Sequence, residues 1–144
     1  RFLAITDLVY GKIQIKRNGI KNILDEYCEL CRNRNISEDR IKQFFKILHE
    51  LLQIFGSENI FRRVNSDDKY EGVLNIGILE ALLGTIVEEG ISVKEDIESM
   101  YKSIMKRIYE DAILDKKPNP FSANTGTEEM IKKRYEITKE IIGV

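Results

Sequence analysis

Apolar residues recur at the three- and four-residue spacing of an amphipathic helix along most of the chain. The pattern predicts a first helix from about residue 2 to residues 11–12. A second is expected at 20–31, after the turn signal Asn18-Gly19, and a third at 38–55. The third has the clearest limits, since Ser37 is a favourable N-cap and Gly56 is a typical C-terminal glycine.

A strongly apolar stretch at about 73–89 predicts the central and most buried helix. Gly77 and Gly84 lie seven residues apart on one of its faces. Because glycine has no side chain, this face would let a neighbouring helix approach closely. Gly90 ends the stretch.

Two more helices follow. A capping box at Ser92-Val93-Lys94-Glu95 predicts the start of the fifth helix. Six side chains of this helix are expected to face the core: Ile97, Met100, Tyr101, Ile104, Ile108 and Ile113. The proline-containing segment 116–120 ends it, and Phe121 is expected to hold the loop against the core. The last helix is predicted to start near 125–127 and to bury Met130, Ile131, Tyr135, Thr138, Ile141 and Ile142.

Strand patterns are weak. Residues 57–72 are mixed and contain a turn cluster at 65–68, and the best alternation, at 11–16, is too short to build a sheet alone. We therefore predict an all-α fold, with about six helices in an orthogonal or irregular bundle that forms one domain over residues 1–144.

Composition limits the possible functions. A chain of 144 residues is long enough to bury a core without disulfides or metals. Its 23 basic and 24 acidic residues give a net charge of −1, whereas a free-standing nucleic-acid-binding domain usually has a basic excess. Any DNA contact therefore requires a local basic patch or another domain.

The absence of a long apolar run or a signal peptide, together with only two cysteines, predicts a cytoplasmic protein that does not enter a membrane. The helical pattern already runs at Arg1, without a capping residue before it. This indicates a C-terminal fragment of a longer chain.

Cys28 and Cys31 form a C-x-x-C pair, but a zinc site needs four ligands and the sequence has one histidine and no second pair. We expect both cysteines to be buried as small apolar residues; a metal site shared with residues outside the chain is the alternative. His49 lies between Phe45 and Leu52 on the helical wheel, and we expect it to bond to water or backbone.

The carboxylate pairs Asp67-Asp68 and Glu88-Glu89 are expected to be a solvated turn and a solvated helix end, because adjacent residues do not converge on one metal ion. The segment 124–127 has two interpretations. It either presents amide groups to a phosphate, or simply provides a turn glycine and an N-cap for the last helix. No catalytic residue, metal ligand or cofactor site is predicted.

Basic residues cluster at Arg62-Arg63, Lys116-Lys117 and Lys132-Lys133-Arg134. Such clusters can contact a phosphate backbone, and Arg62, Arg63, Lys132 and Lys133 are the candidate nucleic-acid-binding residues. The alternative is that they form solvated faces balanced by nearby acids.

Four segments occur in an order that resembles one family: Arg1-Phe2-Leu3-Ala4, the stretch from Phe55-Gly56 to Phe61-Arg62, the run Leu74-Asn75-Ile76-Gly77-Ile78-Leu79-Glu80-Ala81-Leu82, and the ending Phe121, Gly126-Thr127 and Lys133-Arg134-Tyr135. The resemblance is to the helical C-terminal part of the domain of unknown function 262 family, which is similar to the GmrSD-type restriction proteins. In that family an N-terminal ParB/sulfiredoxin-like domain carries the nuclease and nucleotide-hydrolysis motifs, and those motifs have no counterpart here.

The resemblance implies a prokaryotic protein that acts against foreign or modified DNA. It also implies that this chain packs against a nuclease/NTPase domain of the parent protein. Within the matching segments, Asn75 could cap the central helix, and Gly126 and Thr127 could form the turn and cap of the last one. Arg134 could bind carbonyl groups or a carboxylate inside the bundle, and Arg62 could pair with an acid or face DNA.

Two functional hypotheses follow. The first is a non-catalytic accessory domain that packs on the nuclease/NTPase domain and assists DNA recognition. The second is an interaction or oligomerisation scaffold without DNA contact, with a second copy of the chain as a candidate partner.

Overall fold

The computed structural model describes residues 1–32, 35–122 and 126–144. Within these residues the helices are α1 (Phe2–Val9), α2 (Ile20–Cys31), α3 (Glu38–Phe55), α4 (Ile76–Glu89), α5 (Ile97–Leu114) and α6 (Glu128–Ile142). The predicted all-α class is confirmed. Among the described helices, none has the length and apolarity that crossing a bilayer requires.

A small hairpin, which the sequence did not predict, lies between α3 and α4. Strands β1 (Arg63–Val64) and β2 (Tyr70–Glu71) pair antiparallel, with Val64 opposite Tyr70. The expected turn at 65–68 joins them, and its Asn65 side chain accepts hydrogen bonds from the backbone of Asp67 and Lys69. Strands of two residues are too short to produce a readable alternation, which is why the pattern missed them.

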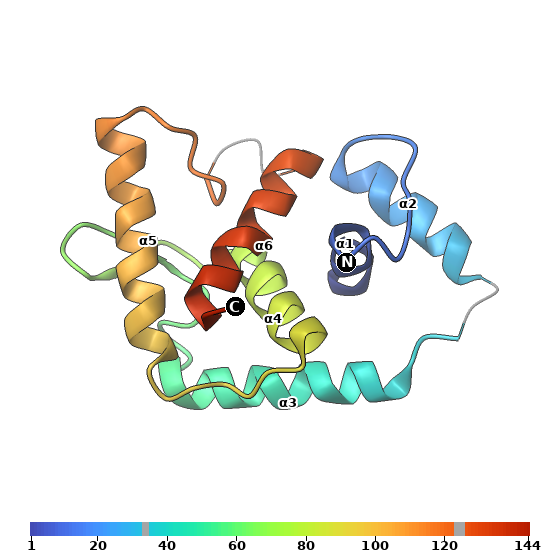
Figure 1. Cartoon of the computed structure of the whole chain (residues 1–144), viewed down its shortest axis with the longest axis horizontal. Coiled ribbons are helices and arrows are strands. Elements are labelled where there is room, and N and C mark those ends of the chain that lie inside the picture. The colour runs from blue at the N-terminus through green and yellow to red at the C-terminus, as the bar shows by residue number, and fades with distance from the viewer. Residues whose placement is uncertain (33–34, 123–125) are drawn as a thin grey trace.

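Helices α4 and α6 pack side by side at the centre of the molecule (Figure 1). Helix α1 contacts both, α5 contacts α6, and α3 crosses beneath them and packs on α4. Helix α2 contacts α1. As expected, α4 is the most buried helix: every residue from Glu80 to Val87 is buried.

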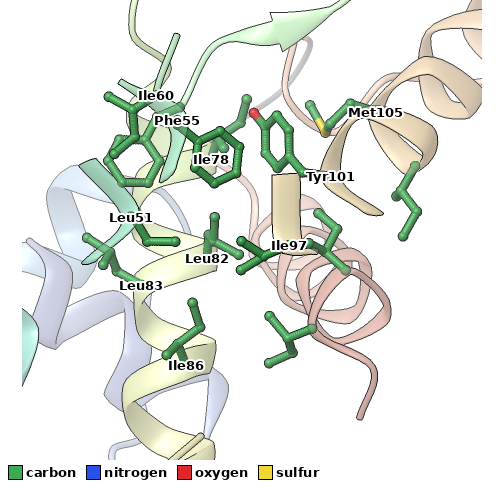
Figure 2. Close-up of a cluster of buried hydrophobic side chains, with 14 of the residues drawn as sticks. Leu51, Phe55, Ile60, Ile78, Leu82, Leu83, Ile86, Ile97, Tyr101 and Met105 are labelled. Atoms are coloured by element: carbon green, nitrogen blue, oxygen red, sulfur yellow. The ribbon is translucent and has the colours of Figure 1, made fainter. Parts of the chain in front are cut away.

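The core has two parts. The larger joins α3, α4, α5 and the C-terminal half of α6, and Figure 2 shows its Leu51, Phe55, Ile78, Leu82 and Tyr101 side chains gathered together. The smaller part joins α1, α2 and α6 around Ile5, Ile23 and Ile131. Phe121 is 2% exposed within the larger cluster, so it does hold its loop to the core.

Most helix limits follow the capping signals. Ser37 caps α3 by accepting a hydrogen bond from the Arg40 amide, and α3 ends at Gly56. Gly90 ends α4 in the left-handed conformation, at φ +64°.

The predicted start of α5 is wrong. The expected capping box at 92–95 is absent, and α5 begins at Ile97 with Asp96 as the N-cap residue. Burial explains this difference, because the helix starts where Ile97 and Tyr101 enter the core, at 3% and 1% exposure. Met100 and Ile113 were also expected to face inward, yet they are 41% and 61% exposed, while Met105 is buried.

Candidate functional site

A buried polar seam runs along the contact between α4 and α6. The Tyr135 hydroxyl lies 2.9 Å from the Thr6 hydroxyl and donates to the Glu80 carbonyl oxygen at 3.1 Å. Further along, the Thr85 and Thr138 hydroxyls are 2.6 Å apart. Because burial disfavours the phenolate, it raises the pKa of Tyr135.

Opposite charges meet at one end of this seam. Glu80 is 2% exposed and accepts from the Arg1 guanidinium through both carboxylate oxygens. Arg134 is 1% exposed and donates to the Pro120 carbonyl oxygen at 3.1 Å. Burial lowers the pKa of the Arg134 guanidinium, and the nearby Glu80 charge opposes that shift. Arg134 therefore binds a carbonyl inside the bundle, one of the roles that the sequence indicated.

Three more residues of the family-like segments also lie around this end: Asn75, Gly126 and Thr127. Asn75 caps α4, since its side-chain oxygen accepts from the amides of Gly77 and Ile78 at 2.9 and 3.2 Å. Its side-chain amide donates to the Phe121 carbonyl oxygen. Thr127 caps α6 and accepts from the Met130 amide, and Gly126 approaches the first residue of α2.

The alternative interpretation of 124–127 as a phosphate-binding turn involves Asn124 and Thr125, which lie outside the described residues. The described part of that segment acts as an N-cap. This arrangement ties the loop before α6 to the start of α4.

The candidate DNA-binding residues differ in their surroundings. Arg62 lies 3.9 Å from the Glu58 carboxylate, and Lys132 forms a 2.7 Å ion pair with Glu128. Arg63 donates to the Ser122 hydroxyl. Lys133 is exposed, and within the described residues neither Arg63 nor Lys133 has an ion-pair partner.

The cysteines correct another prediction. Cys28 is exposed and Cys31 is half-buried, so they are not the buried apolar residues that their spacing suggested. Only Ile23 of α2 is fully buried; it enters the smaller core cluster beside residues of α1 and α6. In the described chain no group of three or more histidine, cysteine and acidic residues is arranged to hold a metal ion. His49 is exposed, and its ring nitrogen lies 3.1 Å from the Gln53 side-chain nitrogen.

The prediction of a solvated Glu88 is wrong as well. Its side chain is 8% exposed and is bound by Arg40 and Lys12. Arg40 also pairs with Asp7 at 2.6 Å, so one guanidinium links α1, α3 and α4. Sequence reasoning missed this network because Asp7, Arg40 and Glu88 lie on three helices that are far apart in the chain.

A cavity of about 220 Å³ lies beside this network, between α1, α2 and the start of α3. Its lining includes Asp7, Tyr27, Cys31 and Arg40. The Tyr27 hydroxyl donates to Asp7 at 3.1 Å, and burial, the Cys31 thiol and Asp7 together raise the Tyr27 pKa. The Asp7 carboxylate and the Arg40 guanidinium bind each other, so these polar groups link α1 to the start of α3 beside the cavity.

Helix α3 has apolar side chains that face solvent. We define the α3 apolar face as Ile41, Phe45, Leu48 and Leu52, which follow one another at spacings of four, three and four residues. Phe45 is 60% exposed and Ile41 is 38% exposed, whereas Leu48 and Leu52 are half-buried against the larger core cluster. The Phe45 ring packs edge-on against Phe44 at 5.3 Å, and Phe44 packs in turn on Phe2.

Comparison with known proteins identifies no relative: no family model, curated protein or solved structure matches the chain.

Proposed function

We propose that this chain is a non-catalytic helical accessory domain of a cytoplasmic, DNA-targeting protein of the restriction type. It packs against a nuclease/NTPase domain of the parent protein and assists DNA recognition. The restriction context comes from the family resemblance. The packing role is supported by one structural observation, the exposed α3 apolar face with Phe45 at its centre.

Phe45 is 60% exposed beside other apolar side chains, so much of its ring is in contact with water. Burial of this apolar surface against a partner is favourable. The four-three-four spacing puts these side chains on one face of α3, where a partner helix would cover the exposed Ile41 and Phe45. Aromatic residues of this kind often carry much of the binding energy at an interface.

Replacing Phe45 with serine is expected to weaken binding of the separately expressed nuclease/NTPase domain by at least about tenfold. Isothermal titration calorimetry would measure the dissociation constant of the two domains. Leu114→Ser is a matched control, because Leu114 is 78% exposed on α5, away from the α3 apolar face. Equal affinity of the wild-type and Phe45→Ser chains for that domain would contradict the proposed packing surface.

The alternative function, a scaffold that forms homo-oligomers without touching DNA, uses the same surface. Sedimentation of the wild-type and Phe45→Ser chains distinguishes the two. The scaffold function is favoured if the wild-type chain is a dimer, the Phe45→Ser chain is a monomer and neither binds DNA. A wild-type monomer with salt-sensitive DNA binding favours the accessory domain.

The proposed role in DNA recognition is supported by Arg63 and Lys133, which have no ion-pair partner in the described chain. The double variant Arg63→Gln/Lys133→Gln is expected to weaken DNA binding about tenfold at moderate salt and to flatten its salt dependence. Fluorescence anisotropy with a labelled duplex would test this. Lys16→Gln/Lys21→Gln removes two exposed charges elsewhere and serves as the control. Equal losses in the two variants would indicate nonspecific charge attraction only.

A further inference from the structure

An apolar cavity of about 100 Å³ lies where the C-terminal ends of α4 and α6 meet the start of α5. Isoleucine and valine side chains form most of its wall: Ile86, Ile91, Val93, Ile97, Ile141 and Ile142. Four of these residues are in the larger core cluster, of which Figure 2 labels Ile86 and Ile97. The wall is therefore fixed by the folded core, and the cavity exists without a ligand.

The size and lining of this cavity define the apolar part of a ligand. An apolar cavity of about 150 Å³ accepts benzene, so one of about 100 Å³ suits a small branched aliphatic group. A water molecule would bind weakly in this cavity, because the apolar wall offers few hydrogen-bond partners. An aliphatic group of matching shape gains dispersion contacts with the isoleucine side chains.

Two opposite charges lie on the lining of the same cavity. Lys94 is exposed, and its ammonium lies 3.4 Å from the Ile142 carbonyl oxygen, a weak contact. Asp96 is the N-cap residue of α5, but its side chain accepts no capping hydrogen bond. In the described chain neither residue forms an ion pair, so each has bonding capacity for a ligand.

The helix ends favour a particular arrangement of ligand charges. The C-terminal ends of α4 and α6 carry partial negative charge at this cavity, and the N-terminus of α5 carries partial positive charge there. A ligand with only a carboxylate would bind Lys94 but would meet Asp96 and the two C-terminal helix ends unfavourably. A ligand with only an ammonium would leave Lys94 unpaired, whereas a zwitterion pairs with both residues.

We propose that this cavity binds a small apolar α-amino acid with a branched side chain of leucine size. The side chain occupies the cavity, the carboxylate binds Lys94, and the ammonium binds Asp96 and the Ile142 carbonyl oxygen. This site is separate from the α3 apolar face and from Arg63 and Lys133, so it stands independently of the proposed function.

Nuclear magnetic resonance titration of the full 144-residue chain with L-leucine tests the site. We expect saturable amide shifts concentrated at 91–97 and 141–144. Three probes each lack one feature: isovalerate lacks the ammonium, isopentylamine lacks the carboxylate, and L-alanine lacks the branched side chain. Each is expected to bind at least about tenfold more weakly than L-leucine.

Charge variants complete the test. Lys94→Gln and Asp96→Asn are each expected to weaken L-leucine binding about tenfold without lowering the melting temperature, because both side chains are exposed. Lys133→Gln is the matched control. The proposal is overturned if L-leucine gives no saturable shifts, if its shifts lie elsewhere, if any of the three probes binds as tightly, or if either variant binds like the wild type.

Discussion

Glu80→Gln is expected to lower the free energy of unfolding by about 3 kcal/mol, since it removes the charge that balances a buried guanidinium. Glu80 and Arg134 are 2% and 1% exposed, and Glu80 attracts Arg134 as well as binding Arg1. With glutamine at position 80, the Arg134 charge stays inside the bundle without this compensation. Urea unfolding monitored by circular dichroism would measure the loss.

A double-mutant cycle tests this interpretation. Arg134→Met removes the buried charge while keeping an unbranched side chain, so Glu80→Gln/Arg134→Met should lose less stability than the sum of the single variants. Glu136→Gln, on the exposed side of α6, is the control and should change stability by no more than about 0.5 kcal/mol. Additive losses would show that the two charges do not interact.

Gly84→Ala is expected to destabilise the protein by about 2 kcal/mol, although alanine is the better helix former by up to ~1 kcal/mol. A Cβ atom at Gly84 would lie 2.6 Å from the Tyr135 hydroxyl oxygen and 2.8 Å from the Thr6 hydroxyl oxygen. Both groups belong to the buried seam, so α4 and α6 must separate or the hydroxyls must lose their hydrogen bonds. Thermal and urea unfolding would both report the change.

Gly77→Ala is the matched control on the same helix. Its Cβ would meet the Arg134 side chain and the Asn75 oxygen at 3.2 Å, which is tight but not overlapping. We expect an effect within about 1 kcal/mol of zero, because the better helix propensity offsets the crowding. If Gly84→Ala proved as stable as the wild type, the close approach of α4 and α6 would not require glycine at that position.

Much of the fold could be predicted from the sequence because it depends on local patterns. The 3.6-residue periodicity located the helices, and Ser37, Asn75 and Thr127 marked three of their starts through short-range hydrogen bonds. The small residues Gly77 and Gly84 correctly indicated the close contact on α4. Each of these signals lies within a few residues of the feature that it predicts.

The failures share a different cause. Ser92 to Glu95 has the sequence of a capping box, but the packing of Ile97 decided where α5 begins. Cys28 lies on an apolar face of α2, yet its side chain is exposed in the described structure. Periodicity identifies an apolar face without saying whether another element packs on it.

The candidate sites show the same limit. The basic clusters are visible in the sequence, but only the fold shows that Lys132 pairs with Glu128, while Lys133 has no ion-pair partner among the described residues. The cavity beside Lys94 could not be predicted, because its wall combines residues from three helices and a connecting segment.

By itself, the sequence determined the helical class, the approximate helix limits and the buried position of α4, since these follow from hydrophobic periodicity and capping. Only the tertiary structure decided which helices pack together, which charges pair, and which apolar residues stay exposed. The physical reason is that residues such as Thr6 and Tyr135, or Arg40 and Glu88, are far apart in the chain. Their contact depends on the packing of whole helices, which no local pattern specifies.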